Sequence, residues 1–192
     1  PTGVDRDTHA PVPAAADKSV RDKRVGRHYL AVMSPAPAAQ DARRYAARIL
    51  SDVLGDSDGS RLYWALVDPG LADEADLSHY ALDGTGAFVA YASCASERAD
   101  EVEKTLLATL DGYANDIRDD EIERARNKIA TQMTVAGETP LGRMRGRGGN
   151  WLYHRAYLPL DQEIEKLMAV TADDVRGLLA DMPFTPRTLM RL

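Results

Sequence analysis

The sequence predicts an α+β domain in which helices pack on one face of a largely antiparallel sheet. Short apolar runs of strand length alternate with segments whose apolar residues recur every three or four positions, the spacing of one helix face. Two of the short runs are separated by an Asp-Gly step at 83–84, which is typical of a hairpin and therefore of antiparallel strands. With 192 residues and 44% apolar content, the chain is long enough for one domain with a substantial core.

The first 26 residues are predicted to be a linker or disordered connector. They contain three prolines among Ala, Asp, Lys and Arg, and their apolar residues follow neither the helical nor the strand period. Residues 27–192 then form a single predicted domain. Because the chain begins at Pro1 rather than at a methionine, we expect it to be a piece of a longer polypeptide.

The predicted domain begins with a strand at 28–34, which Pro35 and Pro37 close. An amphipathic helix follows, in which the apolar residues continue at helical spacing as far as Val53. Gly55 is its predicted C-terminal stop, since glycine readily takes the backbone conformation that ends a helix.

The stretch 59–86 is the most informative part of the chain. Its first half predicts a helix of two or three turns that ends at the Asp-Pro-Gly sequence 68–70, because proline lacks an amide donor and glycine turns the chain. A type II turn there requires a positive φ at Gly70. The hairpin follows, with strands predicted at 78–82 and 87–93.

The rest of the chain is predicted to be mainly helical. Two long helices each carry one apolar stripe, the first running to Ile117 and the second beginning after three acidic residues that suit a helix N-terminus. A further element starts at Thr139. Thr171 and Asp174 approximate a capping box for a short helix, and 188–192 resembles a last strand.

The charge and composition exclude several function classes. A net charge of −6 argues against a surface for nucleic acid or anionic membrane, so a polypeptide or small-molecule partner is more natural. No apolar run approaches the roughly 20 residues that span a bilayer. The only cysteine, Cys94, cannot form an internal disulfide and is interpreted as a small buried residue. The cellular compartment stays open, with a slight preference for the cytoplasm.

Five short motifs occur in an order that matches a known family. They are Ser60-Arg61-Leu62, Gly70-Leu71-Ala72, Glu121-Ile122-Glu123-Arg124-Ala125-Arg126-Asn127-Lys128, Tyr157-Leu158-Pro159 and Ala169-Val170-Thr171-Ala172-Asp173-Asp174-Val175. Together they resemble the C-terminal, zinc-free half of the pitrilysin/insulinase-type zinc metallopeptidases, which include the mitochondrial processing peptidases. The resemblance extends over residues 29–181 and implies the same α+β architecture.

This resemblance implies a non-catalytic half that closes over a zinc-bearing N-terminal half and encloses a peptide substrate. Zinc is expected in that missing half, on a His-x-x-Glu-His helix, and no cofactor is expected in this chain. The four histidines here are isolated along the sequence, with no pair three or four residues apart. We therefore predict no metal site and no catalysis by this chain alone. Whether the two halves share one polypeptide stays open.

In active members of the family, an arginine and a tyrosine of the second half stabilise the oxyanion. By the resemblance, Asp73 stands in place of the tyrosine and Val67 or Asp68 in place of the arginine. An ionised aspartate would repel a developing oxyanion. Either another side chain takes this role or the half only encloses the substrate, and we favour enclosure. The candidate side chains are Arg61, His79 and Tyr80.

The lost arginine and tyrosine also favour a second hypothesis, a catalytically inactive structural or binding subunit derived from a peptidase. The glycine-rich stretch with Arg143, Arg145 and Arg147 does not favour a phosphate site, because alternate positions spread around a helix and no strand leads into it. We interpret these arginines as solvated or paired with acids. Contact of Arg143 or Arg145 with substrate or with the other half remains open, since the glycines allow another chain to approach closely.

Overall fold

A five-stranded sheet forms the centre of the protein, whose structure, a computed structural model, describes residues 12–192. The strands lie in the order β1-β5-β2-β4-β3, and all neighbours are antiparallel except β1 and β5, which are parallel. The strands are β1 (Ala16–Ser19), β2 (His28–Pro35), β3 (Glu74–Ala81), β4 (Gly86–Cys94) and β5 (Thr188–Arg191). The predicted α+β class with a largely antiparallel sheet is confirmed.

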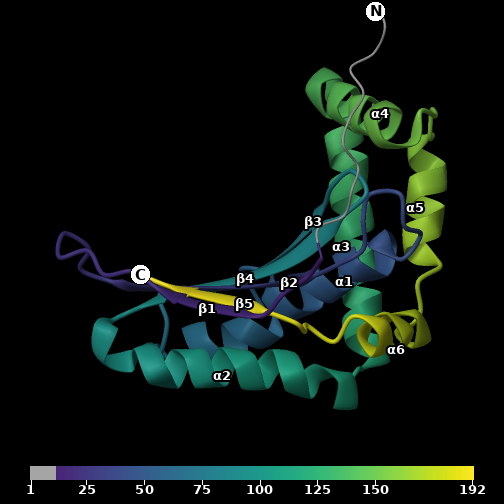
Figure 1. Cartoon of the computed structure of the whole chain (residues 1–192). Coiled ribbons are helices and arrows are strands. Elements are labelled where there is room, and N and C mark those ends of the chain that lie inside the picture. Colours follow the sequence, from purple (N-terminus) through teal and green to yellow (C-terminus); the bar gives the residue numbers. More distant parts are fainter. Residues whose placement is uncertain (1–11) are drawn as a thin grey trace, which may run out of the picture.

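The helices gather on one face of the sheet and at one of its ends. Figure 1 shows α1 and α2 beneath the sheet, while α3, α4 and α5 rise at one end as a helical arm. The elements are α1 (Arg44–Gly55), the π-helix η1 (Tyr63–Val67), the 3-10 helix η2 (Ser96–Arg98), α2 (Ala99–Gly112), the 3-10 helix η3 (Tyr113–Asn115), α3 (Asp119–Glu138), α4 (Pro140–His154), α5 (Leu160–Met168) and α6 (Ala172–Asp181). Within residues 12–192, no helix combines the length and apolarity needed to cross a bilayer.

The alternation of side chains along the strands explains why the helices cover only one face. Successive residues of a strand point to opposite sides of the sheet. Leu30 and Val32 of β2 are buried in the core, as are Phe88 and Ala90 of β4. Met33, which follows Val32, lies on the other face and is 51% exposed. The covered face therefore carries the core, and the other face of the sheet is open.

Helix α1 lies close under strand β3 because its last residue is glycine. A Cβ atom built on Gly55 would come within 1.9 Å of the backbone nitrogen of Leu77. The side chains of Ile49, Leu50 and Leu54 fill the space above the helix and are fully buried. Gly55 ends the helix, as predicted, and it also permits a close approach that the sequence pattern did not reveal.

The central segment contains the predicted helix, turn and hairpin. Ser60 Oγ accepts a hydrogen bond from Tyr63 N at 3.1 Å, which caps the short helix. The helix ends as a π-turn, since Asp68 N donates to Tyr63 O at 2.9 Å, five residues back. Gly70 has φ +70°, which confirms the positive φ expected for the turn. The first hairpin strand begins at Glu74, four residues earlier than predicted.

The capping box of α6 is also confirmed. Thr171 Oγ1 accepts from Asp174 N at 3.3 Å, and the Asp174 carboxylate accepts from Thr171 N at 2.8 Å. Helix α5, by contrast, had no counterpart in the predicted elements. It is short and begins directly after Pro159, a position that proline tolerates because the first helical turn needs no amide donor there.

The stretch predicted as a linker, residues 1–26, contains a strand. Ala16–Ser19 pairs with β5, and Val20 N donates to Arg191 O at 2.8 Å beyond the end of the pairing. Arg191 also forms an ion pair with Asp17. An edge strand held by main-chain hydrogen bonds and one ion pair needs no apolar period, which is why the pattern missed it. Residues 1–11 of the predicted linker lie outside the described part of the chain.

Candidate functional site

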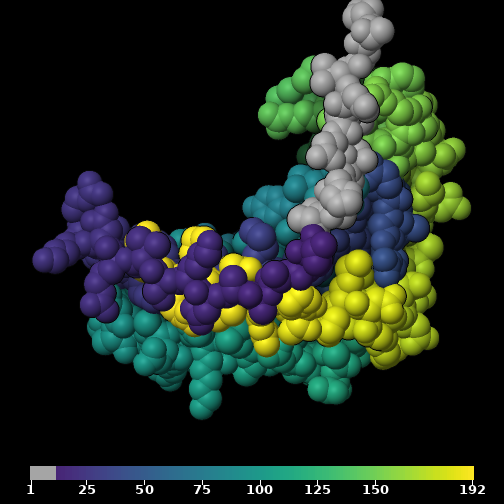
Figure 2. Space-filling view, in the orientation of Figure 1, coloured from purple at the N-terminus to yellow at the C-terminus, as the bar shows by residue number. Residues whose placement is uncertain are grey.

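The open face of the sheet is hollowed into a cavity of about 970 Å³ beside the β3–β4 hairpin. Figure 2 shows the sheet layer and the helical arm meeting at an angle, and the open face borders the inside of that angle. The cavity walls come from β2, β3, β4 and the first residue of β5, from the hairpin turn, from residues 12–14, and from the segments that precede α1 and β5. The apolar lining includes Met33, Ala87, Val89, Met182 and Pro186.

Large apolar side chains are exposed along this face. Met33 of β2, Tyr80 of β3, Leu82 of the hairpin turn and Met190 of β5 are each about half exposed. Single exposed apolar residues are ordinary, but a continuous apolar surface on a sheet marks an interaction site. The open face is therefore suited to contact with another polypeptide.

The other end of the open face is aromatic and acidic. The rings of Tyr29 and Tyr91 stack with centroids 6.3 Å apart, and Asp76 lies opposite Tyr91 in the strand register. Burial, together with the charge of Glu74, raises the pKa of Asp76 above its ordinary value. This end thus offers aromatic surface beside carboxyl groups.

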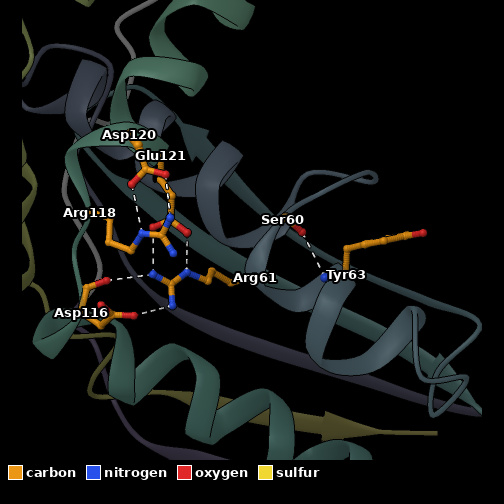
Figure 3. Close-up of polar contacts among 7 residues, drawn as sticks. All are labelled: Ser60, Arg61, Tyr63, Asp116, Arg118, Asp120 and Glu121. Carbon is orange, nitrogen blue, oxygen red and sulfur yellow. Dashed lines mark hydrogen bonds and ion pairs between the residues drawn. The ribbon is translucent and has the colours of Figure 1, made fainter.

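The predicted site residue Arg61 lies away from the cavity and binds α3 (Figure 3). Its Nε and Nη2 donate to the two carboxylate oxygens of Glu121 at 2.7 and 2.9 Å. Nη1 donates to Asp116 Oδ2 at 2.7 Å, and Nη2 also reaches Asp116 O at 2.9 Å. The hydrogen bonds to Glu121 hold the pKa of Arg61 well above its usual range. The guanidinium of Arg61 thus links the short helix to Glu121 and Asp116. Contact of Arg61 with a substrate stays a prediction.

The neighbours His79 and Tyr80 point to opposite faces of β3. His79 Nε2 donates to Pro37 O at 2.8 Å, and its ring lies 5.4 Å from that of Phe88. Burial among these groups lowers the pKa of His79. Tyr80, 53% exposed, lines the open-face cavity. Of these two predicted site residues, only Tyr80 faces the space where a ligand could lie.

Arg143 and Arg145 lie on α4, a helix without a buried residue. Arg143 lines a separate cavity between α3, α4 and α5, whereas Arg145 does not. The predicted site residues therefore lie in three different places. Arg61 and His79 belong to the covered side of the sheet, Tyr80 to the open face, and the two arginines to the helical arm.

Asp73, which stands where the resemblance implies a tyrosine, forms an ion pair with Arg27. Its backbone nitrogen donates to Ser93 O at 2.8 Å, so the residue extends the sheet. The paired carboxylate offers no hydrogen-bond donor to a developing oxyanion. Among the described residues, no group of three or more His, Cys, Asp or Glu side chains could hold a metal ion.

Most residues that line the open-face cavity were not predicted from the sequence to belong to a site. Met33 and Val89 were recognised as strand residues but not assigned to the open face. The signal was present, because β2 and β4 are apolar at consecutive positions and a half-covered strand alternates apolar with polar residues. Met182 and Pro186 carry no such signal, since they reach the cavity from the loop after α6.

Fold and site together define a class: an α+β domain with a helix-covered sheet and an open apolar face. The chain belongs to the family described as the peptidase M16 inactive domain, whose family model matches residues 4–129. It is thus the inactive, non-catalytic domain of a zinc-peptidase family. The family predicted from the ordered motifs is confirmed.

Its relatives include two proteins named as uncharacterized zinc proteases. The one from Streptomyces coelicolor is 30% identical over 151 residues, which is 77% of this chain and 33% of that protein. The one from Bacillus subtilis is 26% identical over 164 residues, 84% of this chain and 40% of that protein. This chain thus spans well under half the length of these relatives.

Solved structures share the fold at low sequence identity. A protease from Helicobacter pylori superposes with a TM-score of 0.83 at 19% identity, over 92% of this chain and 43% of that one. A peptidase M16 inactive domain from Pseudomonas fluorescens gives a TM-score of 0.82 at 14% identity, over 95% and 45%. At these identities the likeness concerns the fold alone.

Proposed function

We propose that this chain is the half of a zinc metallopeptidase that closes over a zinc-bearing N-terminal half and encloses a peptide substrate. The observation that carries the proposal is the open face of the sheet with its apolar cavity of about 970 Å³. An apolar sheet face that is exposed in this domain is suited to contact with another part of the same assembly or with a bound peptide.

The length of the relatives supports a second half. Both named relatives are zinc proteases, and this chain corresponds to 33% and 40% of their lengths. Since the described residues lack a metal-binding group, we place the zinc and its His-x-x-Glu-His helix in the missing half. The contribution of this chain is enclosure, which positions a substrate and excludes water from the reaction.

The test uses the full-length protein that contains this chain. Replacing Met33 and Val89 together by Glu places two charges on the open face, and we expect hydrolysis of an unfolded peptide to fall at least tenfold. The control is Val135→Glu, a change at a residue of α3 that is 58% exposed and lines neither cavity. Equal rates for the double variant and the control would contradict enclosure by this face.

The alternative function is a structural or binding subunit whose assembly has lost catalysis. Asp73 favours it, because a carboxylate paired with Arg27 replaces the hydroxyl of the resembling active peptidases. A full-length protein that binds unfolded peptide on the open face, yet hydrolyses none with zinc supplied, would support this subunit. Zinc-dependent hydrolysis would instead exclude it.

A further inference from the structure

A cavity of about 500 Å³ lies in the helical arm, bounded by α3, α4, α5 and one residue of α1. None of its lining residues contributes to the open-face cavity. Its volume falls within the roughly 300–1,000 Å³ of pockets that hold small ligands. It is therefore a second candidate binding site, and the function proposed above does not use it.

Three arginines from two distant parts of the chain line this cavity. They are Arg48 of α1 and Arg143 and Arg147 of α4. Within residues 12–192, no carboxylate lies within ion-pair distance of any of the three, whereas Arg44 beside them is paired with Glu163. The only carboxylate in the lining is that of Glu163, and it is already bound by Arg44 at 3.4 Å and by Tyr45 Oη at 2.7 Å. The lining thus carries more cationic than anionic side chains.

Two of the three guanidinium groups contact uncharged partners. The Cζ atom of Arg147 lies 5.4 Å from the ring centroid of Tyr157, which also lines the cavity. Arg143 Nη2 donates a long hydrogen bond of 3.3 Å to Glu138 O. Desolvation lowers the pKa of Arg48, and the nearby charges of Asp52 and Glu163 oppose that shift. An anion in the cavity would offset that desolvation.

The remaining lining is apolar, with two side-chain amides. Met133, Leu158 and Leu160 supply the apolar wall, while Gln132 and Asn150 supply groups that both donate and accept hydrogen bonds. Space exists because glycines replace side chains on α4. A Cβ atom built on Gly146 would meet nothing within 4 Å.

We propose that this cavity binds the carboxyl-terminal residue of a peptide. The arginines take the carboxylate, in the charge-assisted geometry for which a guanidinium is best suited. Gln132 and Asn150 pair with the last peptide group, and the apolar wall takes an apolar final side chain. A fatty acid offers the same carboxylate but would leave both amides unpaired, which is why a peptide end is the better occupant. Neither zinc nor the other half is needed for this binding.

The experiment measures binding by calorimetry to the full-length protein after zinc has been removed with a chelator, so that no peptide is cleaved. The probe is a short peptide ending in leucine, in the free-acid form and in the amidated form. We expect the free acid to bind at least tenfold more tightly, and the difference to shrink as salt is added. Equal affinities for the acid and the amide would overturn the proposal.

Variants on one helix separate this site from a general charge effect. R143Q and R147Q should each weaken free-acid binding by about tenfold and should each reduce the preference for the acid over the amide. R145Q removes the same charge from the same helix outside the cavity and should bind as the parent does. If R145Q lost as much affinity as R143Q, the cavity would not be the site.

Two substitutions that change only the space in the cavity test the site independently of charge. Gly146→Phe should fill the cavity and abolish binding, whereas Gly148→Phe adds the same ring where a Cβ also meets nothing within 4 Å but outside the lining. Circular dichroism checks that both variants keep the fold. Unimpaired binding by a folded Gly146→Phe protein would overturn the proposal. Competition by dodecanoate as strong as by the free-acid peptide would overturn the assignment to a peptide end.

Discussion

Phe88 and Val89 are neighbours on β4, yet they belong to two different parts of the protein. Phe88 faces the helices, is 1% exposed and lies against the ring of Phe184 at 5.2 Å between centroids. Val89 faces the opposite side and lines the open-face cavity. The covered face holds the fold together, whereas the open face is free to bind. This division places stability and function on opposite sides of one sheet.

The largest expected effect is on the covered face. Phe88→Ala removes a fully buried ring and should lower the free energy of unfolding by about 3–5 kcal/mol. Val89→Ala on the open face should lower it by less than about 1 kcal/mol, since the removed methyl groups are only partly buried. Urea denaturation of both variants measures the contrast. Similar losses would show that the open face also carries core packing.

The next largest loss of stability is expected from breaking the ion pair between Arg61 and Glu121. Arg61→Gln leaves Glu121, whose side chain is 8% exposed, without its cationic partner. We expect a loss of about 3 kcal/mol, the lower end of the range for breaking a buried ion pair, because Arg61 itself is partly exposed. Arg118→Gln breaks the exposed pair with Asp120 (Figure 3) and should change stability far less, because solvent screens that pair. Thermal denaturation of both variants would show whether burial sets the difference.

A smaller effect is expected at the turn that leads from the covered side into β3. Gly70 has φ +70°, so Gly70→Ala should destabilise the protein by roughly 1–2 kcal/mol, the cost of a left-handed conformation for an L-residue. Gly112→Ala lies in helix α2 with nothing within 4 Å of the new Cβ, and it should stabilise by up to about 1 kcal/mol. Opposite signs in guanidinium melts would confirm the contrast, and a stabilised Gly70→Ala protein would contradict it.

The smallest effect is a pH dependence from His79. Burial lowers its pKa in the folded state below the ordinary value of 6.5, so the unfolded chain binds the proton more readily. The contribution of neutral His79 is therefore complete above pH 6.5 and is lost as the pH falls from 6.5 through the lowered pKa. Melting temperatures between pH 7.5 and 5.5 should fall more for the parent than for His79→Asn. Parallel curves would mean that His79 is not desolvated in the fold.

The contrast between the covered face and the open face of the sheet could be predicted only in part from the sequence. The helical stripes, the turn at Gly70 and the hairpin were predicted because each depends on residues within a few positions of one another. The capping box at Thr171 and Asp174 belongs to the same kind of signal. The candidate residues Arg61 and His79 were chosen by residue type and position in a motif, which does not reveal that Arg61 binds Glu121 and His79 binds Pro37 O.

The amino-acid sequence by itself determined the α+β class, the family, the positive φ of Gly70 and the burial of Cys94, because local periods and ordered motifs encode them. Only the tertiary structure decided which distant groups meet. Arg61 binds Glu121 sixty residues away, and Arg48 and Arg143 line one cavity although they are far apart in the sequence. The pairing of β1 with β5 joins the two ends of the described chain. Such contacts depend on how whole elements pack, and no local spacing records that packing.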